Sequence, residues 1–283
     1  MVSTDAAGSL AAAVSRYLKF ATRRHANRCL RGGRKPALLA AMDARIVDAG
    51  EHRMLYDPAQ WPSASPADLD VERWRARGAR PASGGRGNAW FLPLEAGREW
   101  VLRHYLRGGM ARHVSRDAYV WLGAERTRAW REFRLLQALA RQGLPVPVPV
   151  AARITHCGLR YRQDLVTERV ADSQPLCDVL TERPLPAAGW RQLGRTLARF
   201  HAAGLFHADL NAANLLLQGT DHFYLIDLDR GTLGARPGQQ ARSVRRLRHS
   251  LDKYTRLRPG FHFDQADWLA LQQGLAEPSS EGA

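Results

Sequence analysis

The sequence predicts a fold of the α+β class with two lobes, a small antiparallel sheet in the first lobe and mainly helices in the second. The chain has 283 residues and 45% of them are hydrophobic, which is enough for one two-lobed domain or two small ones. Two strand-like runs around a turn, residues 89–94 and 99–105, lie in the first half. Segments with helical periodicity, residues 190–200 and 242–258, lie in the second half.

The chain is expected to divide into three parts. Residues 1–42 form a basic extension, and residues 43–170 and 171–283 form the two lobes. Up to Lys35 the extension holds eight arginines and lysines against the single Asp5. Its apolar residues could form the stripe of an amphipathic helix on a membrane surface, and a disordered extension is an equally good interpretation.

In the first lobe, the paired strands are followed by a helix and two further strands. Apolar side chains recur at helical spacing between residues 130 and 139, and Gly143 ends this helix. Runs of strand character follow at residues 150–155 and 161–170. Residues 61–66 are rich in proline and serine, which predicts a loop before the sheet.

The second lobe begins with an amphipathic helix over residues 190–200, which Gly204 closes. Two short apolar runs follow at residues 215–217 and 223–226, each near acidic residues. The last expected element, residues 242–258, is a helix that carries seven arginines and lysines.

The charge balance is strongly positive, with 42 Lys and Arg against 27 Asp and Glu and a formal net charge of +15. Such a surface attracts polyanions, whether nucleic acid, an anionic membrane or a phosphorylated substrate, and charge alone does not choose among them. No run approaches the roughly 18 apolar residues that a membrane-spanning helix needs, and no apolar signal segment follows Met1. We therefore expect the protein to stay in the cytoplasm.

The most specific motif is His207-Ala-Asp209-Leu-Asn-Ala-Ala-Asn214, which opens onto an apolar run. An aspartate followed five residues later by an asparagine is typical of the catalytic loop of protein-kinase-like enzymes. Asp209 can orient an acceptor hydroxyl and accept its proton, and Asn214 offers a neutral oxygen to a metal ion. The motif therefore predicts phosphoryl transfer.

A second acidic motif, Leu225-Ile-Asp227-Leu-Asp229-Arg-Gly231, comes shortly after the first. Asp227 ends an apolar strand, where a kinase places the aspartate that holds Mg²⁺. A carboxylate in such a place is costly unless it is paired or bound to metal. Each motif alone also occurs in polar loops of unrelated folds, but their order, spacing and apolar flanks together favour a kinase with Asn214 and Asp227 as metal ligands.

The first lobe supplies candidate residues for binding the nucleotide. Gly85 and Gly87 could place backbone N–H groups over the phosphates, although GxG alone is also a common turn. Arg103 stands one strand later, where most kinases have a lysine that clamps the phosphates. Glu132, early on the following helix, is expected to pair with Arg103, with an exposed helix glutamate as the alternative. Glu168 lies in the expected hinge, whose backbone would face adenine.

These motifs together resemble the Kdo kinase family, the 3-deoxy-D-manno-octulosonic acid kinases of the Gram-negative envelope, which are relatives of heptose kinases and protein kinases. The resemblance covers about residues 50–260 and implies a bilobal protein-kinase-like fold. Besides the two acidic motifs it rests on these segments: Gly85-Arg-Gly87, Val101-Leu-Arg-His-Tyr-Leu-Arg-Gly-Gly109, Asp117-Ala-Tyr-Val-Trp121, Thr127-Arg128 with Glu132-Phe133, and Gly143-Leu-Pro-Val-Pro147. In this family an arginine at the position of Arg103 is usual.

The resemblance implies ATP- and Mg²⁺-dependent phosphorylation of the 4-hydroxyl of Kdo in Kdo-lipid A, during synthesis of the lipopolysaccharide inner core. The acceptor carries a sugar carboxylate and lipid phosphates, which match a protein of charge +15. We expect the enzyme to bind peripherally to the anionic surface of the inner membrane on its cytoplasmic face, and we expect no nucleic-acid partner.

Several basic residues are candidates for contact with the acceptor or the membrane. Three could bind acceptor carboxylate or phosphate, or could equally be solvated loop charges: Arg107, Arg112 and Arg116. Arg230 could stabilise the metal site or bind the acceptor, and the sequence does not decide. Four could steer the protein onto anionic lipid, although a solvated helix face is the commoner explanation: Arg245, Arg246, Arg248 and Lys253.

Two alternatives remain open from the sequence. One is a kinase for another acceptor, such as core heptose, an aminoglycoside or a protein; no activation segment with an A-P-E-like end follows Asp227, and a cationic aminoglycoside would require an acidic cleft. The other is a non-catalytic basic scaffold on a kinase fold that binds membrane or nucleic acid. The presence of Asp209, Asn214 and Asp227 together argues against the scaffold.

Overall fold

The computed structural model describes residues 44–82, 88–105 and 119–277. These residues form two compact units that divide between Ala171 and Asp172. We call residues 44–171 the first unit and residues 172–277 the second unit. The predicted extension of residues 1–42 lies outside the described residues. So do five residues with predicted roles: Gly85, Gly87, Arg107, Arg112 and Arg116.

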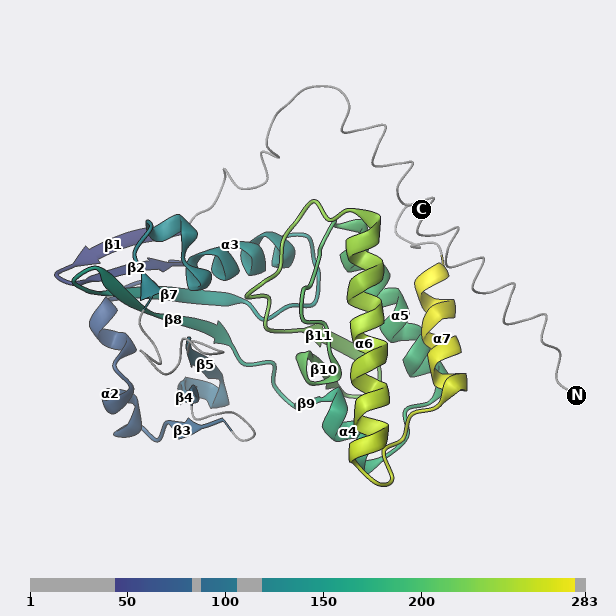
Figure 1. The fold of residues 1–283 in the computed structure, drawn as a ribbon. Coiled ribbons are helices and arrows are strands. Elements are labelled where there is room, and N and C mark those ends of the chain that lie inside the picture. Colours follow the sequence, from purple (N-terminus) through teal and green to yellow (C-terminus); the bar gives the residue numbers. More distant parts are fainter. Residues whose placement is uncertain (1–43, 83–87, 106–118, 278–283) are drawn as a thin grey trace, which may run out of the picture. The chain divides into compact units, whose positions relative to one another are not determined.

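The first unit is built on an antiparallel sheet in the order β1-β2-β7-β8-β5-β4-β3 (Figure 1). The short strand β6 pairs with the beginning of β8. Its strands are β1 (Arg45–Ala49), β2 (His52–Tyr56), β3 (Arg80–Pro81), β4 (Ala89–Pro93), β5 (Glu99–His104), β6 (Tyr119–Val120), β7 (Pro149–Cys157) and β8 (Arg160–Glu168). Its helices are η2 (Pro66–Leu69), α2 (Val71–Arg75), η3 (Glu95–Gly97), η5 (Ala124–Arg126) and α3 (Arg128–Ala140). Every neighbouring pair of strands is antiparallel, and short connections join β1 to β2, β4 to β5 and β7 to β8.

The two faces of this sheet carry different side chains. Successive side chains of a strand point to opposite faces, so Leu102 and Arg103 of β5 lie on different sides. On the side of Leu102, the sheet packs its apolar residues against Leu69 and Trp74 of the η2–α2 segment. On the side of Arg103 lies α3, whose Ala129 N–H donates to the Gln163 side chain of β8 at 2.9 Å.

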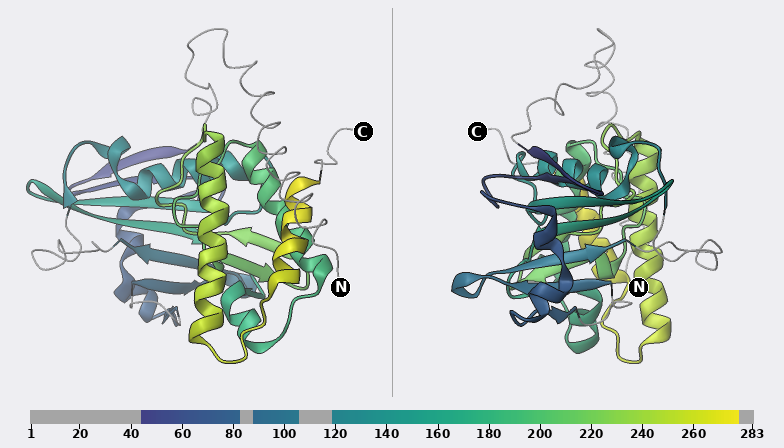
Figure 2. Two further views of the ribbon diagram at one scale, coloured as in Figure 1. Left: turned by 45° about the vertical axis from the view of Figure 1, so that its right-hand side comes forward. Right: turned by 90° about the vertical axis from the view of Figure 1, so that its left-hand side faces the viewer.

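The second unit consists of helices and a small antiparallel sheet in the order β11-β10-β9. Its strands are β9 (Ser173–Pro175), β10 (Leu215–Gln218) and β11 (His222–Leu225), and its helices are α4 (Leu176–Glu182), α5 (Ala187–Ala202), η6 (Ala212–Asn214), α6 (Pro237–Leu257) and α7 (Gln265–Ala276). Helices α5 and α7 lie against each other, as the views of Figure 2 also show. A Cβ on Gly194 would lie 2.2 Å from the Leu271 carbonyl oxygen, and one on Gly274 would lie 1.9 Å from the Arg191 carbonyl oxygen, so only glycine permits this close packing.

The α+β prediction, with a sheet-based first part and a mainly helical second part, is confirmed. Each strand and helix expected between residues 89 and 258 is present, but the strand predicted over residues 161–170 ends at Glu168 and the predicted loop over residues 61–66 runs into η2 at Pro66. The β1–β2 hairpin, α2, α4 and α7 were not predicted. Among the described residues, no helix combines the length and the apolar character needed to cross a bilayer.

Candidate active site

In the second unit, the buried His207 organises the predicted catalytic loop. Its Nδ1 accepts the N–H of Asp209 at 3.1 Å, so Nε2 carries the proton and donates to the Ile226 carbonyl at 3.1 Å. Only 3% of His207 is exposed, and this burial lowers its pKa, with the Ile226 carbonyl acting in the opposite direction. A neutral His207 therefore ties the loop of Asp209 to the segment that leads into Asp227.

A turn between Asn211 and Asn214 fixes the end of this loop. The Asn211 side chain caps η6 by accepting the N–H groups of Ala213 at 2.9 Å and Asn214 at 3.1 Å. The Asn214 side chain donates through Nδ2 to the Asp209 carbonyl at 3.0 Å. This contact turns the Asn214 amide oxygen, the atom that can bind a cation, away from the Asp209 backbone.

Asp227 lies two residues after the end of β11, and the small sheet brings this segment next to Asn214. Leu215 pairs with Leu225 in the register of β10 and β11, and the Ile226 N–H donates to the Asn214 carbonyl at 3.0 Å. Asp227 has a φ of 59°, a left-handed conformation that costs a residue with a side chain about 1–2 kcal/mol. Such strain is characteristic of functional sites.

The segment after Asp227 is held by the backbone. Phe206 and Thr232 exchange two hydrogen bonds of 2.8 and 3.0 Å, and the Gly231 N–H donates to the Leu228 carbonyl at 2.7 Å. Arg230, within this turn, is exposed. The second unit thus brings together the three residues predicted to be catalytic, which are separated in sequence by up to 18 positions: Asp209, Asn214 and Asp227.

The donor set of this site fits Mg²⁺. A carboxylate and an amide oxygen are hard oxygen ligands, and Mg²⁺ is commonly held by one or two carboxylates together with substrate phosphates. Asp227 and Asn214 provide one of each. Across the part of the chain that the structure describes, no group of three or more His, Cys, Asp and Glu side chains is arranged to hold a metal ion.

In the first unit, the predicted pair of Arg103 and Glu132 is formed. The Arg103 guanidinium donates to the Glu132 carboxylate, which is only 2% exposed. Tyr105 was not predicted to take part, yet its hydroxyl donates to the same carboxylate and accepts from Arg103 at 2.8 Å. Tyr105 follows Arg103 by two positions, so strand alternation could have placed both side chains on the α3 side.

Comparison with known proteins assigns this chain to a family. Residues 71–274 match the model of the lipopolysaccharide kinase (Kdo/WaaP) family. The chain belongs to this family. Two similar relatives are named 3-deoxy-D-manno-octulosonic acid kinase: the protein of Stenotrophomonas maltophilia strain K279a is 43% identical over 77% of this chain and 85% of its own length, and that of Xanthomonas campestris pv. campestris strain B100 is 45% identical over 72% and 82%.

The predicted resemblance and the kinase assignment are therefore confirmed. As a lipopolysaccharide kinase, the protein is a phosphotransferase that acts on a hydroxyl group. The matched range includes both acidic motifs and the Arg103–Glu132 pair, and it leaves β1 and β2 outside. The roles of the individual site residues stay predictions.

Glu168 of this lipopolysaccharide kinase lies at the end of β8. Its N–H donates to the Val148 carbonyl at 2.8 Å, and its carboxylate forms an ion pair with Arg98. Any backbone hydrogen bond from the predicted hinge to adenine therefore has to come from a group other than the Glu168 N–H. The role of this stretch in nucleotide binding stays a prediction.

The kinase also has a contact at the catalytic loop that was not predicted. Arg246 of α6 donates through Nη2 to Asp209 Oδ1 at 2.7 Å. Two serines of the same helix bind the loop backbone: Ser243 Oγ donates to the His207 carbonyl at 2.8 Å, and Ser250 Oγ accepts the Ala212 N–H at 3.2 Å. The spacing of Ser243, Arg246 and Ser250 by three and four positions puts them on one helix face, a signal that was present in the sequence.

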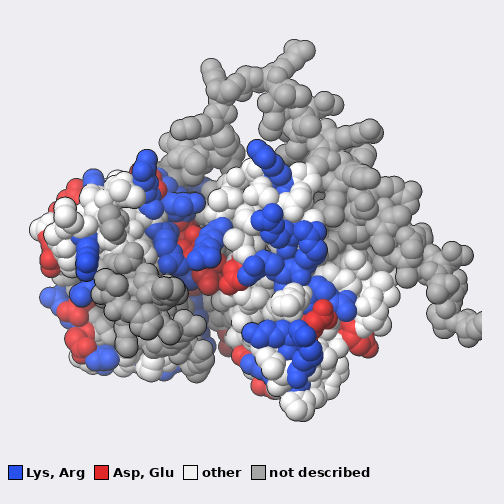
Figure 3. All heavy atoms as spheres, viewed as in Figure 1, with Lys and Arg blue, Asp and Glu red and all other residues white. Residues whose placement is uncertain are grey.

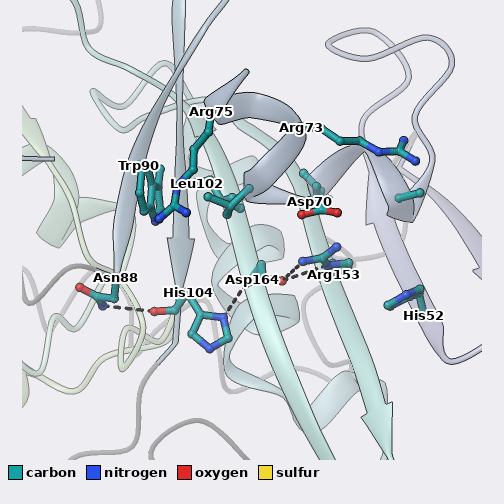
Figure 4. Close-up of a pocket in the computed structure, with 13 residues that line it drawn as sticks. His52, Asp70, Arg73, Arg75, Asn88, Trp90, Leu102, His104, Arg153 and Asp164 are labelled. Carbon is teal, nitrogen blue, oxygen red and sulfur yellow. Dashed lines mark hydrogen bonds and ion pairs between the residues drawn. The ribbon is translucent and has the colours of Figure 1, made fainter. Parts of the chain in front are cut away.

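A polar pocket of about 630 Å³ lies on the other face of the first unit's sheet, the side that carries Leu102 (Figure 4). Its floor is a row of three ion-paired side chains from adjacent strands, and Trp90 and Arg75 form part of its wall. The row consists of Arg153, Asp164 and His104. By strand alternation, this pocket is separate from the Arg103–Glu132 pair.

Proposed function

We propose that this kinase transfers the terminal phosphate of ATP to the 4-hydroxyl of Kdo in Kdo-lipid A, in the synthesis of the lipopolysaccharide inner core. The observation that carries this proposal is the gathering of Asp209, Asn214 and Asp227 by His207 and the small sheet. The choice of acceptor is supported by relatives at 43–45% identity that are named 3-deoxy-D-manno-octulosonic acid kinase.

Each of the site residues in the second unit has a proposed task in the reaction. The Asp209 carboxylate orients the acceptor hydroxyl and takes its proton as the phosphate is transferred. Asn214 and Asp227 hold Mg²⁺ through their side-chain oxygens. When bound with ATP, Mg²⁺ neutralises charge on the phosphates. His207 keeps the two parts of the site in register and stays neutral because burial lowers its pKa.

The first unit contributes the proposed phosphate contact. Arg103 presents a permanent positive charge, and Glu132 and Tyr105 fix its guanidinium. The paired geometry matters because an arginine that is already oriented loses less conformational freedom when it binds phosphate. We assign Gly85 and Gly87 the task of covering the phosphates on the strength of the sequence alone.

The proposed location of the enzyme is the cytoplasmic face of the inner membrane, to which it attaches peripherally. Its support is the net charge of +15 and the lysines and arginines that gather over α6 in Figure 3. Of the four basic residues that are candidates for lipid contact, Arg248 binds Asp252 at 2.8 Å and Gln265 at 3.0 Å within the second unit. Sedimentation with phosphatidylglycerol vesicles at low and high salt tests the attachment, because electrostatic binding weakens as salt rises.

The test of the reaction is incubation of the protein with Kdo-lipid A, ATP and Mg²⁺, followed by mass spectrometry of the lipid. We expect the mass of one phosphate to be added, and fragmentation to place it on Kdo at the 4-hydroxyl. Asp209→Asn, which keeps the size of the side chain, serves as the matched inactive control. A wild-type protein that leaves Kdo-lipid A unchanged, or that adds phosphate only to acceptors carrying core heptose, would contradict the proposal.

A further inference from the structure

Arg246 lies beside the carboxylate that the acceptor hydroxyl has to reach. Its guanidinium contacts Asp209 Oδ1 at 2.7 Å, and a hydroxyl about to be phosphorylated has to come within hydrogen-bond distance of the same carboxylate. Any group of the acceptor near that hydroxyl therefore comes close to Arg246. Because Arg246 is positively charged, it favours an acceptor that carries a negatively charged group at that place.

The backbone of Arg246 is fixed relative to the loop. Ser243 binds the His207 carbonyl one turn before it, and Ser250 binds the Ala212 N–H one turn after it. Leu247, next to Arg246, is fully buried. Both sides of the helix position are thus anchored, so the placement of the Arg246 backbone beside the loop does not depend on its contact with Asp209.

Stability does not account for the Arg246–Asp209 contact. The two side chains are 52% and 54% exposed, and an exposed ion pair contributes little to folding because water screens it. Arginine has five N–H donors in one plane, and the contact with Asp209 is made through Nη2. About half of the Arg246 side chain is therefore open to solvent, directly beside the proposed catalytic carboxylate.

We propose that Arg246 is the subsite for the carboxylate of the acceptor sugar, an inference that rests on the proposed function. In a 3-deoxyoctulosonic acid the carboxylate is attached to the ring carbon that is separated from the 4-hydroxyl carbon by a single methylene. When the 4-hydroxyl meets Asp209, the sugar carboxylate lies within reach of a side chain that touches Asp209 itself. Arginine binds carboxylates with two parallel hydrogen bonds, which gives direction as well as strength.

The subsite has a consequence for specificity. A neutral sugar that offers only a hydroxyl to Asp209 leaves the guanidinium without its anionic partner. Sites built for a charged group reject analogues that lack it, because the charged hydrogen bonds are lost and nothing replaces them. Arg246 thereby distinguishes an acidic sugar from a neutral heptose at the same catalytic loop.

The test compares two acceptors and three proteins. The acceptors are deacylated Kdo-lipid A and the same compound with the Kdo carboxylate reduced to a primary alcohol. Both lack acyl chains, so membrane binding does not affect the comparison. The proteins are the wild type, Arg246→Gln, and Arg242→Gln as the matched control, since Arg242 is an exposed arginine one turn earlier on the same helix. Initial rates give kcat/KM and KM for each combination, and thermal melting checks that each variant is folded.

We expect the wild type and Arg242→Gln to prefer the carboxylate acceptor by roughly 10- to 100-fold in kcat/KM, the size of a lost charged hydrogen bond. Arg246→Gln should lose this preference by a rise in KM for the carboxylate acceptor only. If Arg246→Gln slows both acceptors equally, or if the wild type does not distinguish them, the subsite is wrong while the proposed function stands. If the wild type phosphorylates neither acceptor and leaves intact Kdo-lipid A unchanged, the proposed function fails and the subsite with it.

Discussion

Two aspartates of this kinase are each held by an arginine, but in opposite surroundings. Asp164 lies on the sheet of the first unit with 6% of its side chain exposed, and it accepts from Arg153 at 2.9 and 2.8 Å and from His104 at 2.7 Å. Asp209 lies in the catalytic loop of the second unit with 54% exposed, and it accepts from Arg246 at 2.7 Å. The first carboxylate is enclosed by its partners, whereas the second is open on one side.

This difference in exposure distinguishes a carboxylate that stabilises the fold, Asp164, from one that is available for catalysis, Asp209. Burial alone raises the pKa of Asp164, but the hydrogen bond from His104 and the charge of Arg153 outweigh it and lower the pKa. Arg153, Asp164 and His104 stand opposite one another in the strand register, so the sheet itself sets their contacts. Asp209 is presented by a loop that a buried histidine and one helix hold, which leaves its carboxylate accessible to a substrate.

The largest effect is expected from Asp209→Asn. The amide cannot take the acceptor proton, so turnover should fall roughly 1,000-fold, within the range for loss of a general base. The melting temperature should stay within a few degrees of wild type because the Arg246 contact is exposed. Steady-state kinetics and thermal melting measure both quantities, and a variant with near-normal turnover would show that Asp209 is not the base.

Asp164→Ala should have the opposite profile, with its main effect on stability. Removing the carboxylate leaves Arg153 largely buried without its charge partner, which costs about 3 kcal/mol of unfolding free energy. Urea denaturation measures the loss. The control is Asp178→Ala, which breaks the more exposed pair with Arg258 and should cost less than about 1 kcal/mol. Equal losses in the two variants would contradict the contrast between buried and exposed pairs.

A smaller effect is expected from pH at His201, whose pKa burial lowers from 6.5 to about 4. As pH falls below 6.5 the unfolded state takes up the proton first, so stability is lost between there and about pH 4. The loss from this group between about pH 7 and about pH 5 is about 2 kcal/mol. Urea denaturation should show a weaker acid sensitivity in His201→Leu than in wild type. Identical sensitivity in His201→Leu and wild type would refute the assignment.

The smallest effect is expected from Tyr105→Phe. The substitution removes one hydroxyl that donates to Glu132 and accepts from Arg103, and leaves the packing of the ring. Loss of such a hydrogen bond costs about 1 kcal/mol. We expect a rise of several-fold in KM for ATP, because the Arg103 guanidinium is less firmly oriented. An unchanged KM would mean that Glu132 alone suffices to hold Arg103.

The sequence predicted those features that local patterns determine. Asp209, Asn214 and Asp227 could be recognised because their spacing and apolar flanks are encoded in adjacent residues, and the pair of Arg103 and Glu132 followed from element order. The helix α7 was missed although Asp264 and Asp267 form a capping box at its start, a readable signal. The hairpin of β1 and β2 was missed because β1 is an exposed edge strand without clear alternation.

The contacts that were not predicted depend on tertiary structure. Arg246 meets Asp209 across 37 positions of sequence, and His104 meets Asp164 across 60. Neither separation follows from periodicity, because it depends on strand register and on where a helix packs. From the sequence, Arg246 is a candidate for lipid contact or for a solvated helix face, whereas the structure places its guanidinium against Asp209.

The division of tasks between Asp209 and Asp227 is tested most directly by the affinity for a non-hydrolysable ATP analogue, measured calorimetrically with and without Mg²⁺. Wild type and Asp209→Asn should bind the analogue more tightly when Mg²⁺ is present, whereas Asp227→Asn should bind it equally with and without the ion. An Asp227→Asn variant with the full effect of Mg²⁺, or an Asp209→Asn variant without it, would contradict the account.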